Sequence, residues 1–357
     1  MIGIVFIGDL YVCPYLNIYT KQLEKNNVEY DVLFWNRSNE ELCIPGNYRY
    51  CAVASEEEQW FATKLLDFAK FRFWLKKQLR ARKYEKLIIL STLSGMILSD
   101  VLLRYKGKYF FDIRDYSYES HKIFYEIEKV IIKKSFATSI SSPGFQNFLP
   151  RHDYVIAHNI QRSELELQNM RFQKKQRSNT LNLVWNGTMR YFEHQKKIID
   201  ILSNDSRFAL YYHGAGPELE QYREYCNRIH AKNVYFTGRY SNSDKAKLLA
   251  QADIINNSYW TDKEAEVRYA ISNRFYDGII YRIPQLVEVE TYKTEICQKY
   301  GIGIGLHPNQ QNFGDVLYEW YFRINEEQFN DKCSELMKKV TEDDCQYKKV
   351  VKKFIDA

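Results

Sequence analysis

The residues with the clearest capacity for chemistry form the run Ser272-Asn273-Arg274-Phe275-Tyr276-Asp277. The pattern predicts a helix that begins after Ser272, and the start of a helix presents unpaired backbone N–H groups and the positive end of the helix dipole. A diphosphate binds well at such a point, where Arg274 adds a charge and Asp277 can accept hydrogen bonds from a ribose. The alternative is a capped surface helix with solvated side chains, and this run alone favours that alternative.

Two carboxylates and an arginine, Asp112, Arg114 and Asp115, occupy the end of an expected strand. Ligands of parallel α/β sheets bind beyond the carboxyl ends of the strands, which favours a functional role for these residues. The alternative is an ion pair that closes the strand. Gly8 and Asp9 follow the first apolar run, MIGIVFIG, and we expect them at the same working edge.

Apolar runs alternate with amphipathic segments along the chain, which predicts an α/β architecture. The expected strands occupy residues 1–8, 30–36, 86–92, 108–114, 136–142 and 153–159, and then 181–186, 207–213, 234–237, 252–257, 285–290 and 302–306. The length agrees with two domains, and the polar segment 161–180 predicts a linker between residues 1–160 and residues 181–342. Helices are expected at 313–340 and 347–355, and we expect residues 343–357 to pack back on the first domain.

Composition limits the classes of function. The 357 residues carry a net charge of +6, which is low for a nucleic-acid-binding protein and suits an anionic small molecule or an acidic membrane surface. The seven cysteines include no C-x-x-C pair, which predicts free thiols in a reducing cytosol and no metal site. We expect a cytoplasmic protein with no signal peptide and no membrane-spanning helix.

The segment 68–83 mixes aromatic and basic side chains within a long helix expected at residues 57–83. Such a helix can lie in a membrane interface and be drawn to anionic lipid, which predicts peripheral contact with the inner face of the cell membrane. The alternative is a core helix with a solvated basic face.

Five short motifs in the second half occur in one order: 186–188 (NGT), 214–218 (GAGPE), 236–238 (FTG), 252–254 (ADI), and 273–277 (NRFYD) with Pro284 after it. Their order and spacing resemble the nucleotide-sugar half of GT-B glycosyltransferases, particularly the family-four group of bacterial polysaccharide enzymes. The resemblance covers residues 181–306 well and the first half more loosely. It implies an α/β GT-B fold, in which two Rossmann-like doubly wound parallel-sheet domains face each other across a cleft.

The resemblance also implies roles for single residues. Donor-binding positions are Gly187, Thr188, Lys196, Gly214, Gly216, Thr237, Gly238, Arg239, Ser272, Asn273, Phe275 and Asp277. Arg190 and Arg274 would balance the charge of the diphosphate, with Lys196 as a second cation near Arg190. Many members carry two glutamates eight positions apart, where this chain has Tyr269 and Asp277, with Glu264 and Glu266 out of register.

The function implied is transfer of a hexose from a UDP- or GDP-type sugar to a lipid-linked or growing glycan. Such enzymes build capsule, exopolysaccharide or O-antigen, and the resemblance implies that they keep the anomeric configuration and need no metal or other cofactor. Asp115 or Asp112 would orient the acceptor hydroxyl or accept its proton, with Gly8, Asp9 and Arg114 on the acceptor side. Two alternatives stay open: a non-catalytic partner subunit that binds a nucleotide or glycan, and a nucleotide-sugar epimerase of the same fold.

Overall fold

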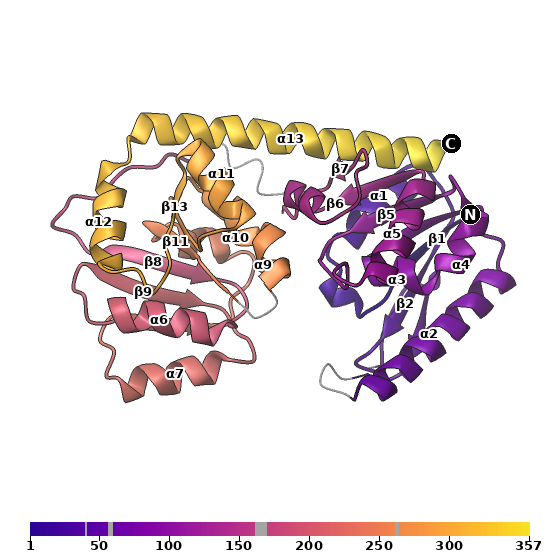
Figure 1. Ribbon diagram of the computed structural model, residues 1–357, viewed down its shortest axis with the longest axis horizontal. Coiled ribbons are helices and arrows are strands. Elements are labelled where there is room, and N and C mark those ends of the chain that lie inside the picture. The colour runs from indigo at the N-terminus through magenta and orange to yellow at the C-terminus, as the bar shows by residue number, and fades with distance from the viewer. Residues whose placement is uncertain (40, 56–59, 161–169, 261–263) are drawn as a thin grey trace. The chain divides into compact units, whose positions relative to one another are not determined.

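The computed structural model describes residues 1–39, 41–55, 60–160, 170–260 and 264–357. Part of the expected linker, 161–169, therefore lies outside the described residues. The chain divides into two compact units, Met1–His158 with Glu342–Ala357, and Asn159–Thr341 (Figure 1). The sequence predicts this boundary at residue 160.

The first unit is built on a parallel sheet that has, within the described residues, the strand order β3-β2-β1-β4-β5-β6-β7. Its strands are β1 (Ile2–Phe6), β2 (Tyr30–Asn36), β3 (Tyr48–Ala52), β4 (Lys86–Leu90), β5 (Tyr109–Ile113), β6 (Ala137–Ile140) and β7 (Val155–Ile156). Its helices are η1 (Leu10–Val12), α1 (Leu16–Lys25), α2 (Phe61–Ala81), α3 (Thr92–Ile97), α4 (Ser99–Leu102), η2 (Leu103–Tyr105), α5 (Lys122–Lys134) and η3 (Pro143–Asn147).

The two faces of this sheet carry different helices. Connections between parallel strands are right-handed, so the direction of a connection along the sheet decides which face its helix covers. The connections that run toward β6 place α2, α3, α4 and α5 on one face. The connection from β1 to β2 runs the other way and places α1 on the opposite face. The α1 face buries Tyr19 and Leu23 together with Tyr347 and Phe354 from the end of the chain. On the opposite face, Phe71 of α2 stacks on Trp35 of β2.

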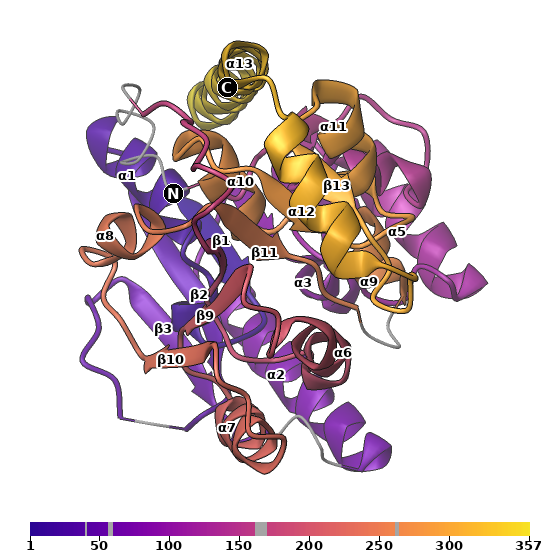
Figure 2. The same ribbon diagram turned by 90° about the vertical axis from the view of Figure 1, so that its left-hand side faces the viewer.

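The second unit has a second parallel sheet with the order β10-β9-β8-β11-β12-β13 in the described part (Figure 2). Its strands are β8 (Leu181–Asn186), β9 (Phe208–His213), β10 (Val234–Gly238), β11 (Ile254–Asn257), β12 (Gln285–Val287) and β13 (Gly303–Gly305). Its helices are α6 (Phe192–Leu202), α7 (Leu219–Arg228), α8 (Lys245–Leu249), α9 (Glu264–Tyr269), α10 (Asn273–Ile280), α11 (Tyr292–Tyr300) and α12 (Phe313–Arg323), followed by the long α13 (Glu326–Asp356).

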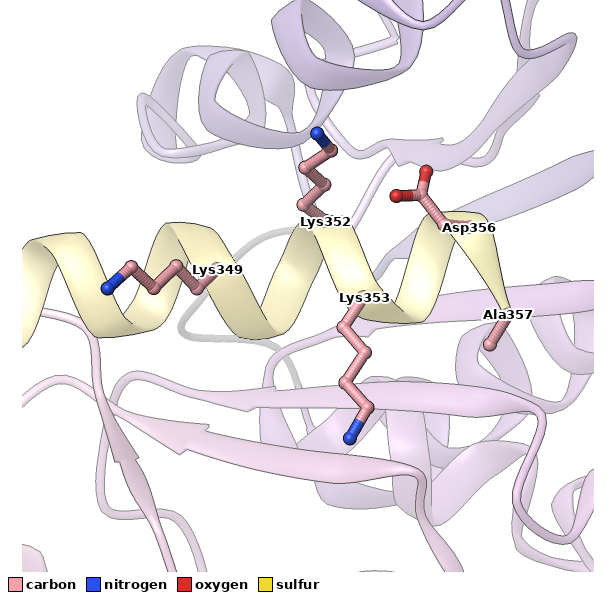
Figure 3. A pocket seen from close by; sticks show the side chains of 5 residues that line it. All are labelled: Lys349, Lys352, Lys353, Asp356 and Ala357. Atoms are coloured by element: carbon pink, nitrogen blue, oxygen red, sulfur yellow. The ribbon is translucent and has the colours of Figure 1, made fainter.

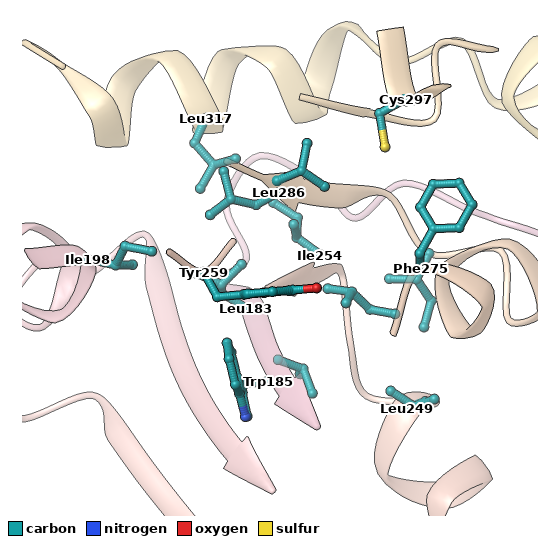
Figure 4. Packing of buried hydrophobic residues seen from close by; sticks show 14 of the residues in the cluster. Leu183, Trp185, Ile198, Leu249, Ile254, Tyr259, Phe275, Leu286, Cys297 and Leu317 are labelled. Atoms are coloured by element: carbon teal, nitrogen blue, oxygen red, sulfur yellow. The ribbon is translucent and has the colours of Figure 1, made fainter. Parts of the chain in front are cut away.

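The core of the second unit reaches up to the carboxyl ends of its strands. Figure 4 shows Leu183 and Trp185 of β8, Tyr259 after β11 and Phe275 of α10 in one packed cluster. Because aromatic side chains at the ends of β8 and β11 belong to this cluster, the loops that follow these strands rest on a rigid base.

Candidate functional site

Arg274 lies in the first turn of α10 and is buried, with 9% of its surface exposed. Its Cζ atom is 3.3 Å from the ring centroid of Trp185 and 5.1 Å from that of Tyr259. Nη1 has no hydrogen-bond partner, and within the described residues no carboxylate forms an ion pair with this guanidinium. Burial lowers the pKa of Arg274, and the nearby charge of Arg190 lowers it as well. A buried cation without a counter-charge is costly, so this position favours binding of an anion.

The start of α10 has no side-chain cap. Ser272 occupies the N-cap position, but its side chain makes no cap hydrogen bond, which corrects the predicted cap. Its hydroxyl instead donates to Oδ1 of Asn257 at 2.7 Å, because the end of β11 brings this amide oxygen within reach. The first-turn N–H groups of α10 therefore have no side-chain acceptor in the described part of the chain, and the exposed Asn273 lies beside Arg274.

The loop after β8 brings a second arginine to the same place. Arg190 is exposed, and its Cζ atom lies 4.9 Å from the ring centroid of Tyr191. The Tyr191 ring in turn stacks on Tyr259, with centroids 4.9 Å apart. Tyr259 thus links the two arginines, as the ring beneath Arg274 and the support of the ring beneath Arg190.

Glycines shape this loop and the loop after β9. Gly187 has φ +121, and a Cβ there would meet nothing within 4 Å. A Cβ on Gly214 would lie 1.8 Å from the carbonyl oxygen of Gly187, and one on Gly216 would lie 2.4 Å from that of Met189. Gly214 and Gly216 therefore allow the two loops to pack on each other, while Gly187 leaves its backbone open. Thr188 is exposed beside it.

The loop after β10 completes this edge of the sheet. Gly238 has φ +79, and its carbonyl accepts a hydrogen bond from the N–H of Gly214 at 3.0 Å. The hydroxyl of Thr237 lies 2.6 Å from Nδ1 of His213, whose pKa is lowered by burial. Arg239 is exposed. The structure thus joins the loops after β8, β9 and β10 through backbone hydrogen bonds.

Two predicted donor contacts look different in the structure. Asp277 is buried, and its carboxylate accepts a hydrogen bond from Nδ2 of Asn186 at 2.7 Å and pairs with Lys245 of α8. The carboxylate expected for a ribose is therefore already engaged. Lys196, expected as a second cation, lies over the ring of Tyr225 of α7 at 5.2 Å, and no contact within the described residues joins it to Arg274. Phe275 belongs to the core.

Lys293, which the sequence does not single out, is a second buried cation at this site. Its Nζ atom is 2.8 Å from Oε1 of Glu288 and 3.4 Å from the ring centroid of Tyr259. Oε2 of Glu288 accepts the backbone N–H of Tyr259 at 3.1 Å, which fixes this residue between Lys293 and Arg274. The buried cations Arg274, Lys245 and Lys293 thus face only two buried carboxylates among the described residues, Asp277 and Glu288. Among these five buried groups one positive charge is left over, and the half-buried Glu218 nearby accepts the backbone N–H of Phe192.

In the first unit, the Asp112 cluster is an internal ion pair. The Asp112 carboxylate is fully buried and accepts hydrogen bonds from Tyr19 at 2.8 Å, Ser139 at 2.7 Å and the Arg114 guanidinium at 2.9 and 3.0 Å. Burial opposes the charge of Arg114, but the Asp112 carboxylate outweighs it and raises the pKa of this arginine. Asp112 therefore has a structural role, which corrects the prediction that it orients an acceptor, and Arg114 is its buried partner.

Asp115 is exposed in the loop after β5, in acidic surroundings. Burial raises the pKa of Glu119 to about 7, and Asp115 adds repulsion. Burial also raises the pKa of Glu128 to about 8, with Glu119 as the nearby charge. Among the predicted acceptor-side residues, Asp9 accepts the N–H of Arg37 at 2.8 Å and so ties the loop after β1 to the loop after β2. Gly8 is buried against the Phe6 ring.

Three other features of the described residues bear on function. Figure 3 shows a shallow hollow at the end of α13, where Lys349, Lys352 and Lys353 extend in different directions. In the part of the chain that the structure describes, no cluster of histidine, cysteine and acidic residues could hold a metal, and the seven cysteines are free. No described helix is long and apolar enough to cross a membrane.

Comparisons with known proteins place the fold. No family model and no curated protein sequence matches the chain. Sucrose-phosphate synthase from Thermosynechococcus elongatus superposes with a TM-score of 0.68 at 10% identity, covering 99% of both chains. HepE from Anabaena, in complex with UDP, superposes with a TM-score of 0.68 at 10% identity, covering 98% of this chain and 99% of its own. WaaG, a glycosyltransferase involved in lipopolysaccharide biosynthesis, superposes with a TM-score of 0.55 at 10% identity, covering 100% of this chain and 95% of its own. The chain has the GT-B fold of two Rossmann-like parallel-sheet domains.

Proposed function

We propose that this protein is a glycosyltransferase that moves a hexose from a UDP- or GDP-type sugar to a membrane-linked glycan of a cell-surface polysaccharide. The observation that carries the proposal is the buried guanidinium of Arg274, which forms no ion pair among the described residues, beside the uncapped start of α10. Solved structures of the same fold support it, since HepE is described with bound UDP and WaaG as a glycosyltransferase.

The departing nucleoside diphosphate gains negative charge in the transition state, and preorganised cations and N–H groups lower that barrier. Arg274, Arg190 and the first-turn amides of α10 are placed to supply them. In this proposal the two guanidinium groups do the work that a metal ion does elsewhere, and the anomeric configuration is retained. Gly187 and Thr188 line the diphosphate, and Thr237, Gly238 and Arg239 hold the base.

On the acceptor side, Asp115 orients the attacking hydroxyl or takes its proton. The exposed carboxylate follows β5 directly, at the sheet edge where ligands of such folds bind. Because Asp112 is held in its ion pair with Arg114, we assign Asp115 as the carboxylate of this cluster that takes part in the reaction. Cytoplasmic sugar transfer at the inner membrane face fits a nucleotide-sugar donor.

A thermal-shift series tests the donor proposal. Diphosphate nucleotides and their sugars are expected to raise Tm, because a ligand that binds only the folded state stabilises it. Nucleosides without phosphate serve as the matched controls and are expected to leave Tm unchanged. The proposed anion site is wrong if no diphosphate nucleotide shifts Tm. It is also wrong if uridine and guanosine raise Tm as much as their diphosphates do.

A non-catalytic binding subunit is the second candidate, favoured by Tyr269 at a position where many members carry glutamate and by the engaged carboxylate of Asp277. Slow donor hydrolysis without acceptor separates the two, since a pure binder releases no sugar. An epimerase would release a free sugar of changed configuration, which product analysis of the same reaction detects.

A further inference from the structure

The helices on one face of the first sheet expose a series of large apolar side chains. They are Leu65, Leu66 and Phe73 of α2, Leu103 of η2, and Ile123, Ile127 and Val130 of α5, and we call them the apolar helix surface. The most exposed members are Ile123 at 79% and Phe73 at 75%. Water-soluble proteins rarely expose such residues in groups, so the surface calls for a partner.

The helices α2 and α5 belong to one layer, in which α4 lies between them (Figure 1). Arg72 and Lys76 of α2 both pair with Asp100 of α4, and α4 packs against α5. The aromatic residues that the sequence assigns to a membrane helix divide between two sides of α2: Phe68 and Phe71 pack on Trp35, and Phe73 faces solvent. The apolar helix surface is thus separate from the core.

The pattern on α5 is that of an interfacial helix. At 3.6 residues per turn, Ile123, Ile127 and Val130 lie within about 60° of one another on the exposed side. The exposed lysines Lys122, Lys129 and Lys133 fall on the adjacent arc. Lys129 pairs with Glu126, the one exposed acid of α5, at 3.4 Å, so Lys122 and Lys133 carry the net positive charge of this arc. An apolar stripe with a basic border is the arrangement that binds a bilayer rich in anionic lipid.

We infer that the apolar helix surface docks this protein on an anionic lipid bilayer, with the stripe of α5 as its main anchor. The lysines beside the stripe supply the charge complementarity that an uncharged protein partner does not require. The stripe begins eight residues after Asp115, and the intervening Tyr118 is also exposed. Docking of the stripe on a bilayer brings the loop of Asp115 to the membrane surface. This consequence rests on the proposed function, in which a lipid-linked acceptor resides at that surface.

Vesicle co-sedimentation tests the inference without any substrate. The wild-type protein is expected to bind phosphatidylcholine vesicles that contain phosphatidylglycerol and to bind pure phosphatidylcholine weakly. The variant Ile123→Glu/Ile127→Glu is expected to lose about tenfold or more in partitioning, because two charges replace the apolar anchor. The matched control is Tyr235→Glu, which changes an exposed aromatic residue of β10 and is expected to bind like the wild type.

Charge is tested separately with Lys129→Glu/Lys133→Glu and with salt. Raising the salt from about 0.1 M to about 1 M shortens the Debye length from about 10 Å to 3 Å and is expected to weaken binding of the wild type. Circular dichroism and Tm confirm that each variant folds. Wild-type-like binding by both double variants overturns the inference. So does a dimer that the Ile variant converts to a monomer, since the surface is then an interface between copies.

The outcome is independent of the donor site. Vesicle binding with no Tm shift by any nucleotide leaves the docking surface intact and removes the proposed transferase. A rise in Tm with a nucleotide but no vesicle binding supports the donor site and overturns the docking surface.

Discussion

The carboxyl edges of the two sheets hold similar residue types with opposite charge balances. In the first unit, Arg114 is paired with Asp112, and Glu119 and Glu128 are carboxyls with no cation partner among the described residues. In the second unit, the carboxylates Asp277 and Glu288 are paired, and the group left over is the guanidinium of Arg274. Among the described residues, the edge of the first unit therefore keeps an excess of carboxyl groups, and that of the second unit keeps a positive charge. The proposed anion site lies at the charge of Arg274, while the paired cluster of Asp112 and Arg114 supports the fold.

The largest expected effect separates the two buried arginines by stability. Arg114→Met leaves Asp112 buried without its partner and is expected to cost about 3–5 kcal/mol in free energy of unfolding. Arg274→Met removes an unpaired buried charge, so it is expected to cost no more than about 1 kcal/mol, the lost contact with Trp185 included. Urea unfolding measures both. Equal losses would mean that Arg274 has a structural partner like that of Arg114.

Activity is expected to respond in the opposite way. Arg274→Ala is expected to lower turnover by about a hundredfold, because a group that stabilises the developing charge of the diphosphate is lost. Arg223→Ala changes an exposed arginine paired with Glu220 on α7 and serves as the control with unchanged turnover. Sugar transfer at the wild-type rate in the Arg274 variant would contradict the site.

Packing of the donor loops gives a smaller effect. In Gly216→Ala the new Cβ would press on the backbone of Met189, so we expect a loss of about 1–3 kcal/mol in stability and weaker nucleotide binding. Gly46→Ala is the control, because a Cβ there meets nothing within 4 Å. If both variants behave alike, the contact between the loops after β8 and β9 does not shape the site.

The smallest effect concerns the acidic excess of the first unit. Glu128 has a pKa of about 8 in the folded protein through burial, against about 4.3 for an unfolded glutamate. Between these values the folded state holds a proton that the unfolded state has lost, so stability falls as pH rises, by at most about 1.4 kcal/mol per pH unit. Glu128→Gln is expected to flatten this slope and to exceed the wild type in stability near pH 8. Glu126→Gln, exposed on the same helix, is expected to keep the slope, and an unchanged slope in Glu128→Gln would refute the assignment.

The sequence predicts most of the sheet order because buried parallel strands read as continuous apolar runs, such as Ile2–Phe6. It misses β3, an edge strand with the mixed sequence YRYCA, and it divides the last helices differently. Residues 324–325 interrupt the expected helix 313–340, and α13 continues through the expected break before residue 347.

The site divides along the same line. The helix start at Ser272 and the place of Arg274 follow from local pattern. The ion-pair partners Lys245, Lys293 and Glu288 do not, because these pairs join separate elements and leave no periodic signal in the sequence. For the same reason the sequence leaves open whether Asp112 is paired.

We propose above all that Arg274 binds the diphosphate of a nucleotide. Calorimetric titration of UDP and GDP into the wild-type protein, Arg274→Ala and Arg223→Ala tests it most directly. We expect at least one nucleotide to bind the wild type and the Arg223 variant with equal Kd. Binding to the Arg274 variant is expected to be weaker by about tenfold or more, the value of a charge-assisted hydrogen bond. Equal affinity in all three proteins would contradict it.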